Sequence, residues 1–196
     1  MGLLATAALT FSKQLLARAV APGSVAVDAT VGNGHDTAFL AGLVGEGGLV
    51  HGFDIQAEAL QAARVLLARE GLADRVRLHH VGHERLVQTL PEAQHGRIAA
   101  VVFNLGFLPG GEATVTTRPE TTLVALMAAC TVLAPGGVLA VVCYTGHPGG
   151  ASEAGQVEGW CQALDFAAWR AARYELVNKP GSPIRLFFVE KHGSAA

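Results

Sequence analysis

The first stretch of this sequence with residues suited to chemistry is an apolar run that leads into a glycine turn, Val25–Thr37. Gly32 and Gly34 permit a positive φ, and their missing side chains leave room for a carboxylate or phosphate beside the start of the next helix. The spacing is G-x-G and lacks the third glycine of a dinucleotide fingerprint. The pattern favours a cofactor-binding turn, and a merely tight turn is the alternative.

A second acid, Asp54, ends the next apolar run, 26 positions after Asp28. A carboxylate there can accept hydrogen bonds from both hydroxyls of a ribose, and capping of the following helix is its alternative role. Together the two motifs indicate an adenosine-containing cofactor; NAD is less favoured, because a third glycine and a hydride-transfer site are missing from the pattern. Asp28 lies inside an apolar run and needs a donor, either the cofactor's ammonium or a loop amide.

A third patch, Val81–Glu84, ends the next run, where an adenine ring would lie over the sheet. Gly82 gives clearance there, and we expect His83 or Glu84 to contact the base or the ribose. The alternative for His83 is a histidine of a solvent-facing loop.

Residues suited to a reaction follow the last two apolar runs. Asn104 begins a glycine-bearing loop with Phe107, and its amide oxygen can accept a hydrogen bond from an attacking amine; a turn asparagine is the alternative. Tyr144 and His147 suit base stacking or proton transfer, and a structural histidine is the alternative. Arg118 suits a phosphate or carboxylate, or is a surface charge at the start of a helix.

Short apolar runs alternate with segments of helical period, which predicts a parallel sheet covered by helices. The expected strands are Ser24–Ala29, Leu49–Asp54, Val76–Val81, Ile98–Phe103 and Val138–Tyr144, and the expected helices are Asp36–Val44, Ala57–Glu70 and Thr121–Leu133. Val76–Val81 carries charged and imidazole side chains, so we expect it near a sheet edge. Ala172–Asn178 and Ile184–Lys191 are joined by too few residues for a parallel crossover, so they should form an antiparallel hairpin.

The composition is that of one ordinary domain, with 196 residues, a net charge of -2 and 51% hydrophobic residues. The apolar residues are too dispersed for a membrane span and the N-terminus lacks a leading positive region, so we expect a cytoplasmic protein. Cys130, Cys143 and Cys161 lack CxxC spacing, which favours reduced, mostly buried thiols. The near-neutral charge excludes a general nucleic-acid binder, and an RNA partner would need a local basic patch.

The combined motifs resemble those of the MnmM (YtqB-like) methyltransferases. The resemblance rests on Asp28-Ala-Thr-x-Gly-Asn-Gly-His-Asp-Thr, Gly52-Phe-Asp-Ile-Gln, Asn104-Leu-Gly-Phe-Leu-Pro-Gly-Gly, Thr117-Arg-Pro-Glu-Thr-Thr and Tyr144-Thr-Gly-His-Pro-Gly-Gly, and it extends from about Phe11 to Lys191. It implies a Rossmann-like class I fold, with a mostly parallel seven-stranded sheet, a C-terminal antiparallel hairpin and helices on both faces. We expect one domain over residues 1–196, with an N-terminal helical segment, 1–22, and a catalytic core, 23–191.

The resemblance also implies an activity, the S-adenosylmethionine-dependent methylation of the 5-aminomethyl group of 5-aminomethyl-2-thiouridine at the tRNA wobble position. It implies cofactor contacts from Asp28, Thr30, Gly32, Asn33, Gly34, His35, Asp36, Thr37, Asp54, Gln56, His83, Asn104, Leu105 and Gly106. It implies substrate contacts from Phe107, Pro109, Gly110, Gly111, Arg118, Tyr144, Gly146 and His147. Relatives usually have Tyr at position 107, so we expect Phe107 to stack only.

In this interpretation Asn104 orients the amine, and Tyr144 or His147 shapes the uridine pocket and relays the proton, with no metal required. The partner is the single-stranded anticodon loop of tRNA, and a homodimer could combine two modest basic patches. Two other classes stay open. They are a methyltransferase of the same fold that acts on rRNA or a small-molecule amine, and a noncatalytic protein that binds S-adenosylmethionine.

Overall fold

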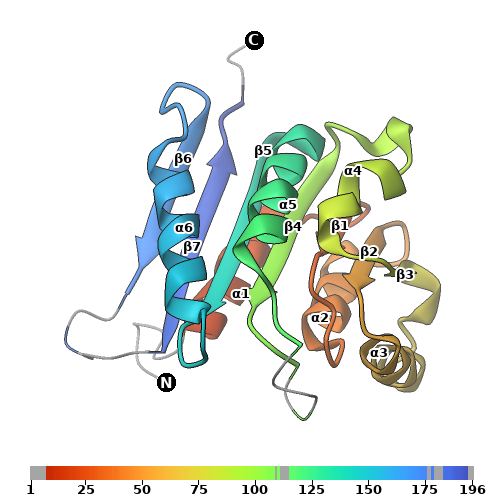
Figure 1. Cartoon of the computed structure of the whole chain (residues 1–196). Helices are drawn as coiled ribbons and strands as arrows, with labels where there is room; N and C mark the ends of the chain where they lie inside the picture. The colour runs from red at the N-terminus through yellow and green to blue at the C-terminus, as the bar shows by residue number, and fades with distance from the viewer. Residues whose placement is uncertain (1–7, 109, 111–114, 176–177, 179–182, 194–196) are drawn as a thin grey trace.

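The computed structural model describes residues 8–108, 110, 115–175, 178 and 183–193, which fold around one seven-stranded sheet (Figure 1). The strand order is β3-β2-β1-β4-β5-β7-β6. The strands are β1 (Val25–Asp28), β2 (Leu49–Asp54), β3 (Val76–His80), β4 (Ile98–Leu105), β5 (Leu133–Tyr144), β6 (Trp169–Tyr174) and β7 (Ile184–Lys191). Strands β1 to β5 pair in parallel, whereas β7 pairs antiparallel to both β5 and β6, so the expected fold class is confirmed.

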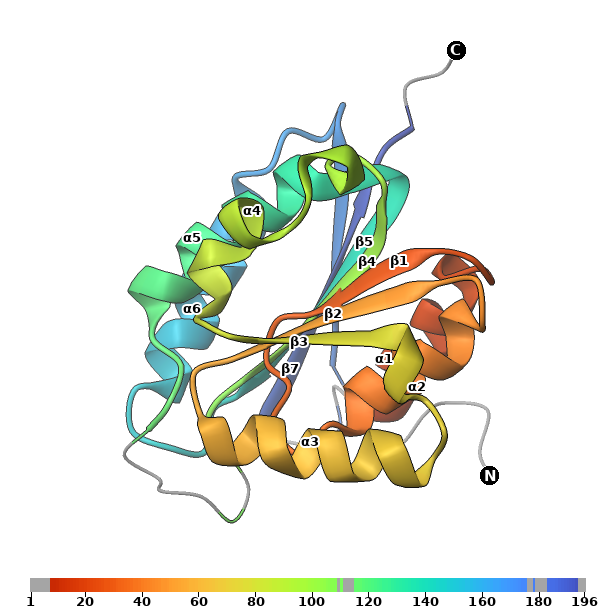
Figure 2. The ribbon, with the colours of Figure 1, turned by 90° about the vertical axis from the view of Figure 1, so that its right-hand side faces the viewer.

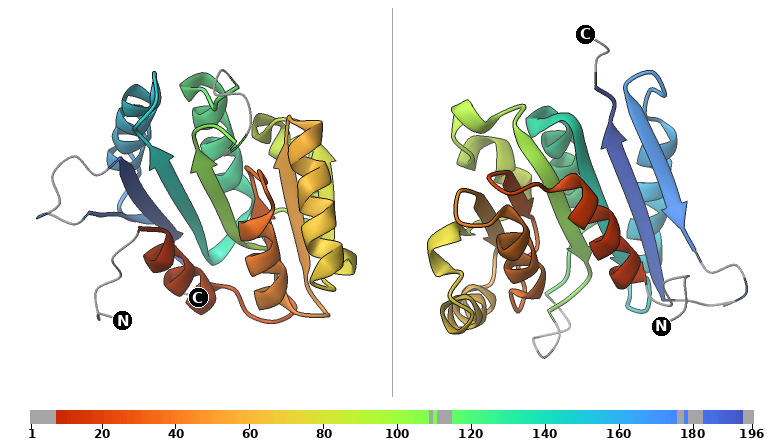
Figure 3. Two further views of the ribbon diagram at one scale, coloured as in Figure 1. Left: turned by 90° about the horizontal axis from the view of Figure 1, so that it is seen from below. Right: turned by 180° about the vertical axis from the view of Figure 1, so that it is seen from behind.

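Helices cover both faces of this sheet. Figure 2 shows α1 (Ala8–Ala19), α2 (His35–Val44) and α3 (Ala57–Arg69) on one side, and α4 (Leu86–Thr89), α5 (Pro119–Val132) and α6 (Gly150–Gln162) on the other. Three short 3-10 turns, Ala73–Arg75, His83–Arg85 and Glu92–Gln94, complete the described elements. The view from behind in Figure 3 shows α1 lying across the sheet beside α2, and α1 contacts both β5 and β7.

The central strands are buried from both sides, which explains their nearly continuous apolar sequence. In β4, Val101 and Phe103 pack into the core beneath α4, α5 and α6, whereas Ala100 and Val102 pack into the core beneath α1, α2 and α3. Strand β3 stands at the edge of the sheet and has a mixed burial pattern, as its polar side chains predicted.

Several predicted boundaries are wrong, and each has a physical reason. Asn104 belongs to β4 itself, because the ladder with β5 continues to Leu105. The helix α6 was not expected, since its glycines at 150, 155 and 159 lower helix propensity. The first hairpin strand runs over Trp169–Tyr174 rather than Ala172–Asn178, and Leu176 and Val177 lie outside the described residues.

The three cysteines are free thiols, and Cys143 and Cys161 are buried. Burial raises the pKa of the Cys143 and Cys161 thiols to about 12, which is the inert behaviour expected of structural cysteines. Within the described part of the chain, no helix has the length and apolar character needed to cross a membrane.

Two imidazoles, the buried ring of His51 and the half-buried ring of His79, join β2 to the edge strand β3. The Nδ1 atom of His51 lies 2.9 Å from Nε2 of His79, and the ring of His79 stacks on Phe53 with centroids 4.8 Å apart. His51 is only 3% exposed. Burial and the neighbouring His79 lower the pKa of His51 from 6.5 to about 4, so the folded state holds this ring neutral.

The neutral ring of His51 should therefore contribute to the stability of the folded state, and this contribution to the free energy of unfolding should be lost as the pH falls. Below pH 6.5 the unfolded chain binds a proton that the folded ring accepts only near pH 4, so stability falls across this window. We expect His51→Gln to destabilise the protein less at pH 5.0 than at pH 7.5 in urea unfolding. His192→Gln, at an exposed position, is the control, and a His51→Gln deficit that does not change with pH would contradict the prediction.

Candidate functional site

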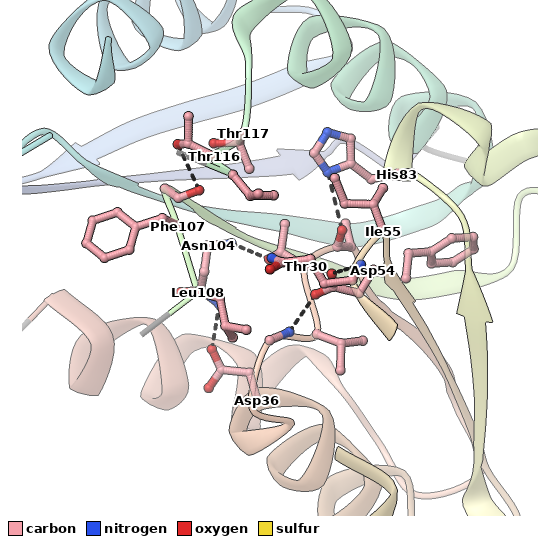
Figure 4. A pocket seen from close by; sticks show the side chains of 18 of the residues that line it. Thr30, Asp36, Asp54, Ile55, His83, Asn104, Phe107, Leu108, Thr116 and Thr117 are labelled. Carbon is pink, nitrogen blue, oxygen red and sulfur yellow. Dashed lines mark hydrogen bonds between the residues drawn. The ribbon is translucent and has the colours of Figure 1, made fainter. Parts of the chain in front are cut away.

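A cavity of about 890 Å³ opens at the carboxyl ends of the parallel strands (Figure 4). This is the edge at which open α/β sheets bind ligands, and the volume is in the usual range of small-molecule sites. Residues from α1, from the ends of β1, β2, β4 and β5, and from the loop before α5 line the cavity. The site therefore gathers segments that are far apart in the sequence.

The glycine turn after β1 is held in place by Asp54. Its Oδ2 accepts a hydrogen bond from the amide of Gly32 at 2.8 Å, and its Oδ1 accepts one from the amide of Gln56 at 2.9 Å. Gly32 and Gly34 both have positive φ, as predicted. A Cβ on Gly34 would lie 2.8 Å from Ala63 of α3, so this glycine is required for helix packing rather than for ligand clearance.

Asp28 lies beneath the turn and is fully buried, so it does not line the cavity. Its carboxylate accepts hydrogen bonds from the hydroxyl of Thr37 at 2.6 Å and from the amide of Thr30 at 3.1 Å. The donors that Asp28 requires are thus supplied by the chain itself, as a loop amide and a helix hydroxyl. Burial and the nearby carboxylate of Asp36 raise the pKa of Asp28 from 3.8 to about 7.

An apolar wall stands beside Asp54 at one end of the cavity. Ile55 is 58% exposed and lines the cavity together with Phe53, Gly82 and His83. His83 is buried rather than solvent-facing, because its Nδ1 contacts the carbonyl oxygen of Ala29 at 3.3 Å and its ring meets Phe103 edge-on. Burial lowers the pKa of His83, which favours the neutral ring. A flat ring can pack against this wall, where it would contact Ile55 and His83.

Asn104 stands at the other end of the cavity in a network of polar contacts. Its backbone amide donates to the hydroxyl of Thr30 at 2.7 Å, and its side-chain Nδ2 donates to Oδ2 of Asp36 at 2.8 Å (Figure 4). The other oxygen of Asp36 lies 3.0 Å from Nζ of Lys13. The contact of Lys13 with Asp36 was not predicted, because α1 meets α2 only through tertiary packing.

In the loop between β4 and α5, the two ends are hydrogen-bonded to each other, and a side chain of α6 holds the second end in place. Gly106 and Phe107 meet the returning chain, since the carbonyl oxygen of Gly106 accepts from the amide of Thr117 at 2.9 Å and Phe107 forms a bridge with Thr116. Glu153 of α6 is 2% exposed and accepts from the hydroxyls of Thr117 at 2.8 Å and Thr122 at 2.6 Å.

Glu153 is a residue that the sequence interpretation missed. An available signal was its position four residues before Val157 and eight before Cys161, on the buried stripe of α6. An acid in an apolar stripe needs buried donors, and here the donors are Thr117 of the loop that forms the cavity wall and Thr122 in the first turn of α5.

Two aromatic side chains form the outer wall near the predicted substrate side. Tyr144 lines the cavity, and burial together with Asp36 raises its pKa. Phe107 also lines the cavity, is 43% exposed and meets the ring of His147 edge-on, with centroids 5.8 Å apart. His147 itself does not line the cavity, because its Nδ1 turns to the carbonyl oxygen of Pro148 at 3.0 Å.

Most of the predicted site residues meet in this one cavity. Thr30, Gly32, Asn33, His35, Asp36, Asp54, Gln56, His83, Asn104, Gly106, Phe107, Arg118 and Tyr144 line it. Asp28, Gly34, Thr37, Leu105, Gly110, Gly146 and His147 do not; Asp28, Thr37 and Leu105 are buried in the core behind it. Pro109 and Gly111 lie outside the described residues. The lining residues that were not predicted include Leu9, Ile55 and Thr121.

The buried carboxyl of Asp28 predicts a pH-dependent stability of the unliganded protein. The unfolded chain releases this proton near pH 3.8 and the folded chain only near pH 7, so ionisation costs the wild type stability as the pH rises through this window. The side chain at position 28 cannot ionise in Asp28→Asn. As the pH rises, the free energy of unfolding of this variant should therefore increase relative to that of the wild type, by at most about 1.4 kcal/mol per pH unit. Urea unfolding at pH 5.0 and 8.0 measures this, with exposed Asp74→Asn as the control; equal differences at both pH values would contradict it.

The chain is similar over most of its length to proteins of solved structure. The chain is 39% identical to the "putative rRNA-methylase" of Clostridium thermocellum, with a TM-score of 0.91 over 96% of this chain and 100% of that one. It is 32% identical to a "putative methyltransferase" of Streptococcus mutans solved in complex with SAH, with a TM-score of 0.86 over 96% of this chain and 99% of that one.

A curated relative is the chloroplastic tRNA (mnm(5)s(2)U34)-methyltransferase of Arabidopsis thaliana. It is 36% identical over 86% of this chain, which spans 64% of the plant protein's length. The family model described as "Putative rRNA methylase" matches residues 50–190, a range that runs from β2 to the end of β7 and includes Asp54, Asn104 and Glu153. With this match, and with solved relatives covered over their full length, the chain belongs to the rRNA methylase family.

Proposed function

We propose that this chain transfers a methyl group from S-adenosylmethionine to the 5-aminomethyl nitrogen of 5-aminomethyl-2-thiouridine at the wobble position of tRNA. The observation that carries the proposal is Asn104, an amide anchored at the inner end of a cofactor-sized cavity. The name of the Arabidopsis thaliana relative supports the tRNA substrate, and the SAH bound to the Streptococcus mutans relative supports the cofactor.

The residues present fit S-adenosylmethionine. Each oxygen of Asp54 already accepts one amide hydrogen bond and keeps a further lone pair for a ribose hydroxyl. Ile55 and His83 offer an apolar site for the adenine, and the Gly32 turn lies where the methionine part would be held. When bound, the cofactor supplies a methyl group on a sulfonium, which is already an activated donor.

The chain's own residues have to align the amine and keep it free of its proton. With the cofactor bound, the transfer would form a bond from the neutral amine nitrogen to the methyl carbon and break the bond from that carbon to sulfur, and the electron pair of the broken bond would stay on sulfur. The nitrogen then sheds one proton to solvent. Asn104 accepts a hydrogen bond from the amine and so directs the nitrogen lone pair at the methyl group.

A wobble base must be presented as a single-stranded nucleotide, and the outer part of the cavity suits this. Phe107 and Tyr144 offer aromatic faces on which a uridine can stack. Arg118 is exposed at the N-cap of α5 and lines the same opening, where it can bind a phosphate of the anticodon loop.

The substrate is tested by incubating the enzyme with labelled S-adenosylmethionine and tRNA from a strain that lacks the terminal wobble methylation. We expect the label in the methylaminomethyl nucleoside when the product is analysed by nucleoside mass spectrometry. Fully modified tRNA is the matched control and should accept no label. Label in ribosomal RNA or in small amines, with none in the hypomodified tRNA, would contradict the proposed substrate and leave a methyltransferase of another specificity.

Asn104 is tested by two substitutions that remove its amide in different ways. Asn104→Ala and Asn104→Asp should both lower kcat, by about 10²-fold or more, the loss typical of a hydrogen bond that acts in the transition state. The aspartate keeps the shape but cannot donate to Asp36, so it should not rescue activity. Cofactor affinity from calorimetry should stay within a few-fold of the wild type. Full turnover by either variant would remove Asn104 from the mechanism.

A further inference from the structure

The helix α1 precedes the first strand of the sheet, yet it supplies part of the cavity wall. Leu9 and Lys13 of α1 line the cavity. The ammonium of Lys13 lies 3.0 Å from Asp36 and 5.1 Å from the ring centroid of Phe39, both on α2. The Lys13 side chain is 39% exposed and that of Asp36 is 20% exposed, so the pair sits at the cavity surface rather than in the core.

Asp36 determines which way the amide of Asn104 points. A carboxylate can only accept hydrogen bonds, so the atom of Asn104 that lies 2.8 Å from Asp36 must be the NH₂ group. The amide oxygen of Asn104 is therefore directed away from Asp36 and is free to accept from a substrate amine. Because Lys13 binds the other oxygen of Asp36, the carboxylate is held from both sides.

A carboxylate close to the reacting amine also creates a chemical problem. A primary alkylamine has a pKa of about 10 in water, and a nearby negative charge stabilises its ammonium form further. An ammonium has no lone pair and cannot attack a methyl group. Asp36, Asp54 and Glu84 all line the cavity, so an uncompensated Asp36 would hold the substrate in its unreactive state.

The charged and titratable groups around Asp36 come from several elements. Lys13 approaches from α1, and Tyr144 from β5 has its pKa raised by burial and by Asp36. Asp28 of β1, buried beneath the turn, has its pKa raised by burial and by Asp36. His35, Asp54, His83, Glu84 and Arg118 stand elsewhere on the cavity wall. Among the described residues, Lys13 forms the ion pair with Asp36.

We propose that Lys13 is a positioning residue that acts through Asp36: it fixes the amide of Asn104 and keeps the reacting amine in its neutral form. The inference rests on the proposed function, since it requires an amine nucleophile. It also makes α1 part of the catalytic apparatus. A partly exposed ion pair contributes little to stability, about 0 to 1 kcal/mol, so its consequence is chemical rather than structural.

The test compares Lys13→Met with Lys13→Arg and with Arg18→Met in the full chain. Arg18 is an exposed cation of the same helix that does not line the cavity. We expect Lys13→Met to lower kcat about tenfold at pH 7.5 and to move the midpoint of the kcat–pH profile about one unit higher, with the KM for tRNA within about twofold. Lys13→Arg should restore most of kcat, and Arg18→Met should match the wild type.

A double substitution separates the two effects of the pair. Lys13→Met with Asp36→Asn removes the uncompensated carboxylate, so the pH midpoint should return toward that of the wild type. The rate should stay low, because an amide at position 36 no longer dictates which way Asn104 points. A pH midpoint that stays high in the double variant would overturn the role assigned to Asp36.

Other outcomes would overturn the role of Lys13. An increased KM for tRNA with unchanged kcat would assign Lys13 to RNA binding, and a melting temperature lowered by more than a few degrees would make its role structural. If the wild type methylates no tRNA, the side-chain NH₂ resonances of Asn104 still decide the matter. They should be protected from solvent exchange in the wild type and in Arg18→Met, and lose protection in Lys13→Met. Unchanged protection in Lys13→Met would refute the role of the Lys13–Asp36 pair in fixing the amide of Asn104.

Discussion

A hydrogen bond from the backbone amide of Asn104 to the hydroxyl of Thr30, at 2.7 Å, extends the pairing of β1 with β4 beyond the end of their ladder. These are the strands between which the order of the sheet reverses, with β2 and β3 on one side and β5 on the other. The end of the cavity that contains Asp54 and His83 is built on the first side, and the end that contains Asn104 and Tyr144 is built on the second. A displacement at this junction would therefore separate the two halves of the site.

Carboxylates organise the backbone around that junction. Asp28, Asp36, Asp54 and Glu153 each engage two donors. The donors to Asp28, Asp54 and Glu153 belong to loops or to helix starts, whereas Asp36 binds Asn104 of β4 and Lys13 of α1. Burying a charge is costly unless it is hydrogen-bonded. Each acid therefore selects one conformation of the segment it binds, and the loops are held by side chains rather than by regular secondary structure.

The sequence predicted the parts that follow from local pattern. The alternation of strands and helices, the edge position of β3, the terminal hairpin, and the placement of Asp54 and Asn104 at the carboxyl edge all depend on periodicity and on the geometry of parallel sheets. The contacts of Lys13 and Glu153 were not predicted, because their partners are brought to them only by tertiary packing. Asp28 was placed beside the cofactor, but its donors turned out to be Thr30 and Thr37. The side chain of His147 packs against the ring of Phe107 and does not line the cavity, which no spacing reveals.

The position of β7 has a consequence for how the molecule is made. Strand β7 lies between β5 and β6, and α1 packs on both β5 and β7. During synthesis α1 is made well before β7, the strand that completes its docking surface. A nascent chain that stops before Ile184 lacks the β7 part of this surface, so α1 then packs on an incomplete sheet. The final placement of α1 at the cavity is thus coupled to the synthesis of β7.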